Sequence, residues 1–155
     1  MKRKFNFRQI VFAVAVTASL AVIGYFYLSP KAGADEIRIA KSEITSSARF
    51  YPYQLDGVKM EVLAVKATDG TVRTAFNTCQ VCYSSGRGYY VQSGQYLVCQ
   101  NCGNRFHVNQ VEVVRGGCNP IPIAEEDKQD DGKYVVIAKD YMAGAKDYFS
   151  NWKKA

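Results

Sequence analysis

Alternating apolar and polar residues dominate the part of the chain between residues 49 and 98, and this alternation predicts strands. Three turn pairs, Asp56-Gly57, Asp69-Gly70 and Ser93-Gly94, separate the alternating segments and are typical of tight β-hairpins. The predicted strands are residues 49–55, 59–66, 71–76, 89–92 and 95–98. We therefore expect most of the fold to consist of antiparallel neighbours.

Two short apolar runs and one helical pattern complete the chain. Residues 108–114 and 134–138 are rich in β-branched side chains, which predicts two further strands. From Asp140, a candidate helix cap, apolar residues recur at helical spacing and predict a C-terminal amphipathic helix that packs on the sheet or, alternatively, docks a partner. This stripe consists of Tyr141, Ala145, Tyr148, Phe149 and Trp152. The expected fold class is α+β, mainly antiparallel β, with a small sheet or barrel-like core.

The N-terminal part has a different pattern, because residues 10–28 carry no charge. At about 1.5 Å per residue, a helix of this length spans about 28 Å, close to the hydrocarbon thickness of a bilayer. We therefore expect residues 1–34 to form a basic tip and a transmembrane anchor. Because basic residues within 2–8 precede the span, the positive-inside rule predicts a cytoplasmic tip and an extracytoplasmic domain at 35–155. The alternative is a signal peptide cleaved near residues 32–34. Under either interpretation the functional domain lies outside the cytoplasm.

The net charge adds to this topology and excludes one class of function. The chain has 20 Lys and Arg against 14 Asp and Glu, a formal charge of +6, and the basic residues at 2–8 supply four of these charges. The remaining surplus of two provides no basic stripe for a phosphate backbone, so we expect no nucleic-acid partner. Residues 124–132 (AEEDKQDDG) instead predict an acidic surface loop that docks a basic partner.

Four of the five cysteines form the pattern C-x2-C-x16-C-x2-C, with Cys79, Cys82, Cys99 and Cys102. Two short turns joined by a hairpin bring four thiolates to one tetrahedral site, so this spacing predicts a metal or cluster site. Gly103 fits a tight turn after the second pair. No histidine follows either pair directly, which excludes covalent c-type haem. Two disulfides or redox-active CxxC motifs remain an alternative outside the cytoplasm.

The fifth cysteine makes the count odd and favours a cluster over paired disulfides or a four-sulfur zinc site. Cys118 lies between a Gly-Gly pair and two prolines, in a rigid loop suited to presenting a ligand. Iron–sulfur clusters use thiolates at irregular spacings. His107, the single histidine, is expected to have a packing role or, alternatively, to bind or tune the cluster. Tyr89 and Tyr90 are expected to shield the site.

Residues 49–123 resemble the FtrD-like membrane iron–sulfur family. The segments that carry the resemblance are Phe50-Tyr51-Pro52-Tyr53, Asp56-Gly57, 64–70, RTAFNTCQVCY (73–83), GYYVQ (88–92), LVCQNCGNRF (97–106) and GGCNPIPI (116–123). The resemblance implies a cluster bound at Cys79, Cys82, Cys99, Cys102 and Cys118, and a role in passing electrons during ferrous-iron uptake beside an iron permease. Larger members have several membrane spans where this chain has one.

Three functions follow from these observations. The first is a single-pass, membrane-anchored iron–sulfur electron carrier with a redox or iron-permease partner, for which cofactor chemistry makes a general acid–base pair unnecessary. The second is a structural zinc module used for protein interaction. The third is a thiol–disulfide redox protein. The motifs favour a non-enzymatic carrier over an enzyme.

Overall fold

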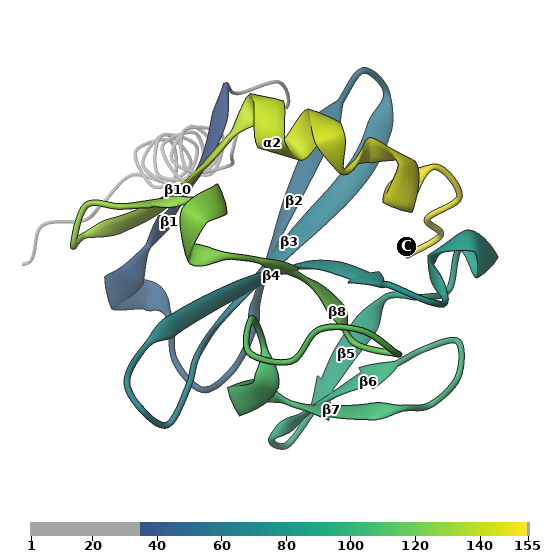
Figure 1. The fold of residues 1–155 in the computed structure, drawn as a ribbon, viewed down its shortest axis with the longest axis horizontal. Coiled ribbons are helices and arrows are strands. Elements are labelled where there is room, and N and C mark those ends of the chain that lie inside the picture. Colours follow the sequence, from purple (N-terminus) through teal and green to yellow (C-terminus); the bar gives the residue numbers. More distant parts are fainter. Residues whose placement is uncertain (1–34, 155) are drawn as a thin grey trace, which may run out of the picture. The chain divides into compact units, whose positions relative to one another are not determined.

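The structure, a computed structural model, describes residues 35–154, which form three antiparallel sheets and one short α-helix (Figure 1). The strands are β1 (Glu36–Ala40), β2 (Arg49–Leu55), β3 (Val58–Lys66), β4 (Val72–Cys79), β5 (Tyr90–Ser93), β6 (Tyr96–Cys99), β7 (Arg105–His107), β8 (Pro120–Ile123), β9 (Gln129–Asp130) and β10 (Tyr134–Ala138). The helix α2 spans Lys139–Gly144. The 3-10 turns are η1 (Lys41–Glu43), η2 (Tyr83–Ser85), η3 (Val108–Gln110), η4 (Glu125–Asp127) and η5 (Lys146–Phe149). The predicted α+β class is confirmed, although the sheets of this part of the chain stay open and form no closed barrel.

The central sheet has the strand order β2-β3-β4-β8 and is covered on both faces. In β3, six consecutive residues from Met60 to Val65 are buried. Met60, Val62 and Ala64 face one core, whereas Leu63 and Val65 face the other. A strand that is buried on both faces loses the apolar–polar alternation of a half-exposed one. The molecule therefore has two hydrophobic cores separated by this sheet.

The first core lies between the central sheet and the chain ends. The sheet β1-β10-β9 joins the first described strand to the last two strands, with Glu36 opposite Ala138. Along the C-terminal segment, Met142, Ala145 and Phe149 are buried in this core. The aromatic stripe thus packs on the sheet as predicted. The predicted C-terminal helix is, however, divided into the six-residue α2 and the 3-10 turn η5. Ala138 occupies the cap position in place of Asp140.

The second core lies between the central sheet and the small sheet β5-β6-β7, which Figure 1 shows below the central strands. Large apolar residues fill it, including Leu63, Tyr90, Leu97 and Phe106. Cys79 and Cys99 belong to the same core. The cysteine motifs are therefore built on the side of the molecule away from β1 and β10.

The predicted hairpins are present, and the backbone geometry of their turns explains why the turn residues predicted them. Asp56 and Gly57 have φ values of 49° and 83°, as the tight turn between β2 and β3 requires. The prediction for residues 108–114 was wrong, because this run forms η3 and a following turn in which Glu112 has a φ of 67°. The strand β8 was not predicted. Its prolines lack N–H donors, and it is tolerated as a strand because it lies at the edge of its sheet.

The expected membrane anchor at 1–34 lies outside the described residues. Within 35–154, no helix has the length and the apolar character needed to cross a membrane.

Candidate metal centre

The five cysteines come together at the ends of two strands and on one loop. Cys79 ends β4 and Cys99 ends β6, and their side chains are 0% and 1% exposed. The second cysteine of each motif follows in the adjoining turn: Cys82 is half-buried and Cys102 is exposed. Cys118 arrives from the loop before β8 and is half-buried. The two CxxC motifs are thus equivalent in their strand positions but differ in exposure.

The sulfur atoms form one compact group. Those of Cys79, Cys82, Cys99 and Cys118 all lie within 4.8 Å of one another. Cys118 Sγ lies 3.3 Å from Cys79 Sγ and 3.0 Å from Cys102 Sγ, so it contacts both a buried and an exposed thiol. The sequence pattern alone had paired the four CxxC cysteines; the structure places Cys118 in the middle of the group and Cys102 at its outer edge.

Each CxxC motif is a tight turn whose backbone N–H groups point at the first sulfur. Cys79 Sγ accepts hydrogen bonds from the N–H groups two and three positions later, the second at 3.3 Å. Cys99 Sγ accepts the corresponding pair. Gly103 has a φ of 74°, as the predicted turn requires. Burial raises the pKa of Cys79, but hydrogen bonds from the Tyr90 hydroxyl and these N–H groups outweigh it and hold the pKa below its ordinary value.

The other thiols differ in pKa according to their burial. Burial raises the pKa of Cys82 to about 11 and also raises the pKa values of Cys99 and Cys118. A hydrogen bond from Cys118 lowers the pKa of Cys102 to about 7. Metal ions bind thiolates, so a metal that binds here must displace thiol protons, and its affinity must rise with pH.

The Tyr90 side chain closes the inner wall of the site, as the sequence predicted for a shielding residue. It is fully buried, and its hydroxyl lies 3.8 Å from Cys118 Sγ. Burial and a hydrogen bond to Cys79 strongly raise the pKa of its phenol, so the hydroxyl stays protonated and acts as a donor. A protonated hydroxyl beside two sulfurs stabilises negative charge on them.

A buried polar network beneath the site was missed by the sequence analysis. Asn77 is fully buried; its Oδ1 accepts from the Tyr90 N–H at 2.7 Å, and its Nδ2 donates to Glu61 Oε2 at 2.5 Å. Trp152 Nε1 donates to the Asn77 carbonyl at 3.0 Å, and Lys154 Nζ pairs with Glu61. The sequence signals this network only through the polar residues Asn77 and Thr78, which directly precede Cys79 at the end of β4. The network ties the C-terminal segment to the strand that carries Cys79.

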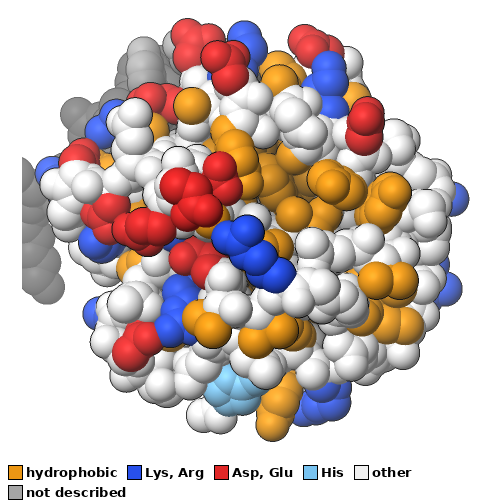
Figure 2. Space-filling view, in the orientation of Figure 1, with side chains coloured by type: hydrophobic (Ala, Val, Ile, Leu, Met, Phe, Trp, Pro, Cys, Tyr) orange, Lys and Arg blue, Asp and Glu red, His pale blue; other side chains and the backbone are white. Residues whose placement is uncertain are grey.

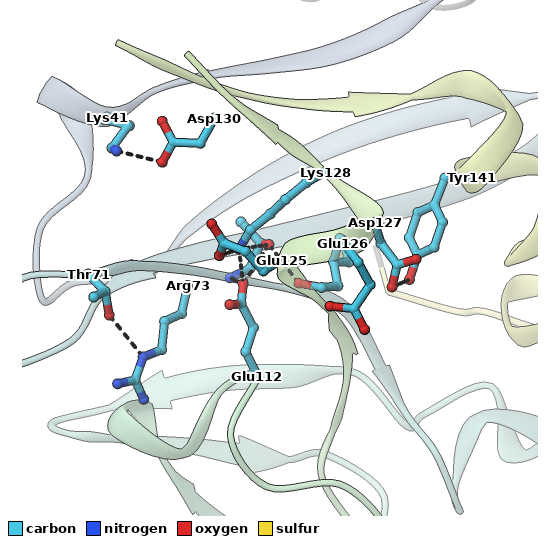
Figure 3. Close-up of polar contacts among 12 residues, drawn as sticks. Lys41, Thr71, Arg73, Glu112, Glu125, Glu126, Asp127, Lys128, Asp130 and Tyr141 are labelled. Carbon is cyan, nitrogen blue, oxygen red and sulfur yellow. Dashed lines mark hydrogen bonds and ion pairs between the residues drawn. The ribbon is translucent and has the colours of Figure 1, made fainter. Parts of the chain in front are cut away.

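The loop that brings Cys118 to the site is fixed at both ends. At its start, Glu112 Oε1 accepts from Thr74 Oγ1 at 2.9 Å and forms an ion pair with Lys128, whose side chain is 3% exposed (Figure 3). At its end, Asn119 is 1% exposed, and its Nδ2 donates to carbonyl groups on both sides of Cys118. These anchors hold Cys118 against the sulfurs of the two CxxC turns.

The sulfur group fits a thiolate-bound metal. A tetrahedral ion with metal–sulfur bonds of about 2.3 Å holds its ligands about 3.8 Å apart. The four sulfurs here all lie within 4.8 Å of one another, which is compatible with that distance. A cluster of several irons holds thiolates further apart, because irons and sulfides lie between them. The turns at 101–104 and 113–117, which carry Cys102 and precede Cys118, are exposed to solvent. All five thiols are soft ligands, which suits iron–sulfur clusters and zinc alike.

Two further features singled out in the sequence are His107, which caps a turn, and the acidic segment 124–132, which lies at the surface. His107 caps η3: its Nδ1 accepts from the Asn109 N–H at 3.1 Å and its Nε2 lies 3.2 Å from Gln95 Oε1, so the structure gives it the packing role. In the acidic segment, Glu125 and Glu126 have side chains that are 80% and 74% exposed. Figure 2 shows acidic side chains gathered on this face beside a band of hydrophobic ones.

Comparison with known proteins agrees with this chemistry. No curated protein and no solved structure matches the chain. A family model described as "Membrane iron-sulfur containing protein FtrD-like" matches residues 43–149, a range that includes all five cysteines and the whole central sheet. The chain therefore belongs to the FtrD-like family of membrane iron–sulfur containing proteins.

Proposed function

We propose that this protein is a membrane-anchored electron carrier whose cysteine thiolates hold an iron–sulfur group on the extracytoplasmic side, where it serves ferrous-iron uptake. One observation carries the proposal: five thiols from three separate segments meet at one end of the second core. Membership in an iron–sulfur family supports the identity of the metal. The partner would be a redox protein or an iron permease.

The residues around the sulfurs suit this role. An iron–sulfur group, when bound, takes up and releases single electrons. Cys79 and Cys99 lie in the dry core, and the Tyr90 ring excludes water from the inner side. The Cys102 side is exposed, so a partner protein can approach the sulfurs closely there. The acidic segment 124–132 gives a basic partner a second contact.

Anaerobic purification of the full chain in detergent tests the proposal. We expect broad visible absorption that bleaches on reduction, together with iron and acid-labile sulfide in the metal analysis. A colourless protein with one zinc per chain would overturn it. Fractions prepared with iron or zinc in the growth medium control for adventitious loading.

A structural zinc site is the second candidate, and the sulfur spacing favours it. Four sulfurs within 4.8 Å fit a single tetrahedral ion without rearrangement. The same purification separates the two functions, because zinc is colourless and does not change oxidation state. A thiol–disulfide role has less support: both first cysteines end strands and open turns, whereas a redox-active CxxC motif of the thioredoxin type opens a helix.

A further inference from the structure

We propose that the face around the exposed Cys102 is the docking surface for a redox protein whose own contact face is acidic. This inference rests on the proposed function, since it assigns the partner that exchanges electrons with the iron–sulfur group. It adds the chemistry of that partner: its acidic side chains meet arginines around the cysteine turns.

Exposed apolar side chains lie beside the cysteines. Six large apolar residues are exposed among residues 35–154, and three of them flank the cysteine motifs. Val81, which is 61% exposed, lies inside the first CxxC motif, and Val113 and Val114 lie on the loop that leads to Cys118. Exposed apolar side chains with a polar rim mark protein–protein contact sites. These valines therefore provide the apolar part of an interface next to the sulfurs.

Hydrogen bonds join the cysteine-bearing segments into one surface. Gln80, in the first CxxC turn, accepts from the Gly116 N–H at 2.8 Å through its Oε1, and its own N–H donates to the Asn119 carbonyl at 3.2 Å. In the second CxxC turn, Asn104 Nδ2 donates to the Cys118 carbonyl at 2.7 Å. Both turns and the Cys118 loop thus face a partner together.

The exposed charges of these segments are positive. Residues 79–124 contain one acid, Glu112, no lysine and three arginines, which are Arg87, Arg105 and Arg115. All three arginines are exposed, whereas Glu112 is half-buried and forms an ion pair with Lys128. Arginine is enriched at protein interfaces and pairs well with carboxylates. The segments that carry the sulfurs therefore favour an acidic contact face.

Two of the arginines lie directly beside the cysteine turns. Arg87 Nη2 donates to the Gln100 carbonyl, inside the second CxxC motif, at 3.1 Å. Arg115 Nη2 lies 3.9 Å from Glu126 Oε1, so Arg115 stands at the boundary between the Cys118 loop and the acidic segment 124–132. Acidic residues of the partner contact the arginines around the sulfurs, and its basic residues contact the acidic segment beyond Arg115.

Two haem proteins of opposite charge provide the test: cytochrome b5, which has an acidic contact face, and cytochrome c, which has a basic one. Stopped-flow absorbance follows one electron as it leaves the reduced full chain in detergent and converts ferric haem to ferrous haem. Salt screens charges at an interface. We expect added salt to lower the rate constant with cytochrome b5, because it screens an attraction, and to raise the rate constant with cytochrome c.

Removal of two arginine charges should weaken the acidic contact. In Arg87→Gln/Arg115→Gln we expect the rate constant with cytochrome b5 at low salt to fall at least about fivefold, with iron content and visible spectrum unchanged. Glutamine at position 87 keeps a donor for the Gln100 carbonyl. The matched control is Arg38→Gln/Lys139→Gln, which removes two exposed charges from β1 and α2; we expect it to react like the wild type.

Two results would overturn the inference. One is a wild-type rate in Arg87→Gln/Arg115→Gln. The other is attraction of cytochrome c in place of cytochrome b5 that disappears in Glu125→Lys/Glu126→Lys, which would make the acidic segment the docking surface and the partner basic.

The absence of electron transfer to either haem protein is a different outcome, because it contradicts the proposed function. Equilibrium binding of cytochrome b5 to the zinc-loaded chain then tests the docking surface by itself. Weaker binding to Arg87→Gln/Arg115→Gln than to the wild type would support it, and equal binding would contradict it.

Discussion

At the scale of single residues, the Tyr90 hydroxyl has the most direct influence on the sulfurs. The ring is fully buried in the second core, and the sulfurs of Cys118 and Cys79 are the hydrogen-bond acceptors beside the hydroxyl. Hydrogen bonds to ligand sulfurs stabilise the more negative, reduced state of an iron–sulfur group and so raise its reduction potential.

We therefore expect Tyr90→Phe to lower the midpoint potential of the reconstituted protein while its iron content stays unchanged. Spectroelectrochemical titration measures the shift. Tyr89→Phe is the control, since that ring packs against Trp152. Equal potentials for the wild type and Tyr90→Phe would show that the hydroxyl has no electronic effect on the site.

Single residues also show how far sequence reasoning reached. The spacing of the four CxxC cysteines predicted one shared site, because two strand-end turns joined by a hairpin must meet. The place of Cys118 at the centre of the group was not predictable, because it depends on the anchors at Glu112 and Asn119. The hydrogen bonds of Asn77 were not predictable either, since its partners are 13 to 75 positions away.

At the scale of elements, the C-terminal segment stabilises β3 and β4 through side-chain contacts. Lys154 pairs with Glu61, which is 8% exposed and also accepts from Asn77. A buried carboxylate that loses its cation keeps the cost of its desolvation without the ionic contact that offset it.

Lys154→Met should lower the free energy of unfolding by about 1–3 kcal/mol, as urea denaturation can measure. Adding Glu61→Gln should recover part of that loss, because the double variant leaves no unpaired charge. Lys153→Met, at the exposed neighbouring position, should change stability by less than about 0.5 kcal/mol. Strictly additive effects of the Lys154 and Glu61 substitutions would argue against the ion pair.

The turn between β9 and β10 makes a pH-dependent contribution to the stability of the fold. The N–H groups of Tyr134 and Lys133 donate to Asp131 Oδ1 at 2.6 and 2.9 Å and hold the pKa of this carboxyl below its ordinary value. A lowered pKa in the folded state stabilises the fold above the ordinary pKa, about 3.9, and the contribution disappears as the pH falls through the lower value.

Asp131→Asn keeps an acceptor oxygen but cannot titrate. We expect the wild type to be more stable than this variant at pH 7, and the difference to shrink in urea titrations at pH 3. A difference that stays constant between these pH values would mean that the turn does not use the charge of Asp131.

Elements were predictable where local geometry alone decided them. The Asp-Gly and Ser-Gly hairpins were found because their turns require unusual φ values that few residues adopt. Residues 108–114 and β8 were misjudged, because tertiary contacts outweigh local preference there. Valines at 108 and 111 pack into the second core from a turn, and two prolines pair with β4 along a sheet edge.

At the scale of the whole molecule, the central sheet separates the core that carries the sulfurs from the core that contains the first described strand. The site lies on the second core, whereas β1, which follows the expected anchor, belongs to the first. The proposed topology then requires the domain to be outside the cytoplasm and attached through residues 1–34.

A reporter fusion tests this topology. Alkaline phosphatase joined after residue 155 should be active and should sediment with membranes, because the positive-inside rule places the domain outside. The same fusion without residues 1–34 should be inactive and should stay in the soluble cytoplasmic fraction. Equal phosphatase activity with and without residues 1–34 would contradict the assigned orientation.

The pairing of β1 with β10 has a consequence for how the protein is made. Glu36 meets Ala138, and Trp152 completes the support beneath Asn77, so the fold closes only after residue 154 has left the ribosome. All five cysteines are synthesised before that point. A nascent chain therefore carries free thiols before the segments that hold them in place have been made. Under the proposed function, metal insertion then follows the synthesis of the C-terminal segment, and the thiols are open to oxidation until that segment is in place.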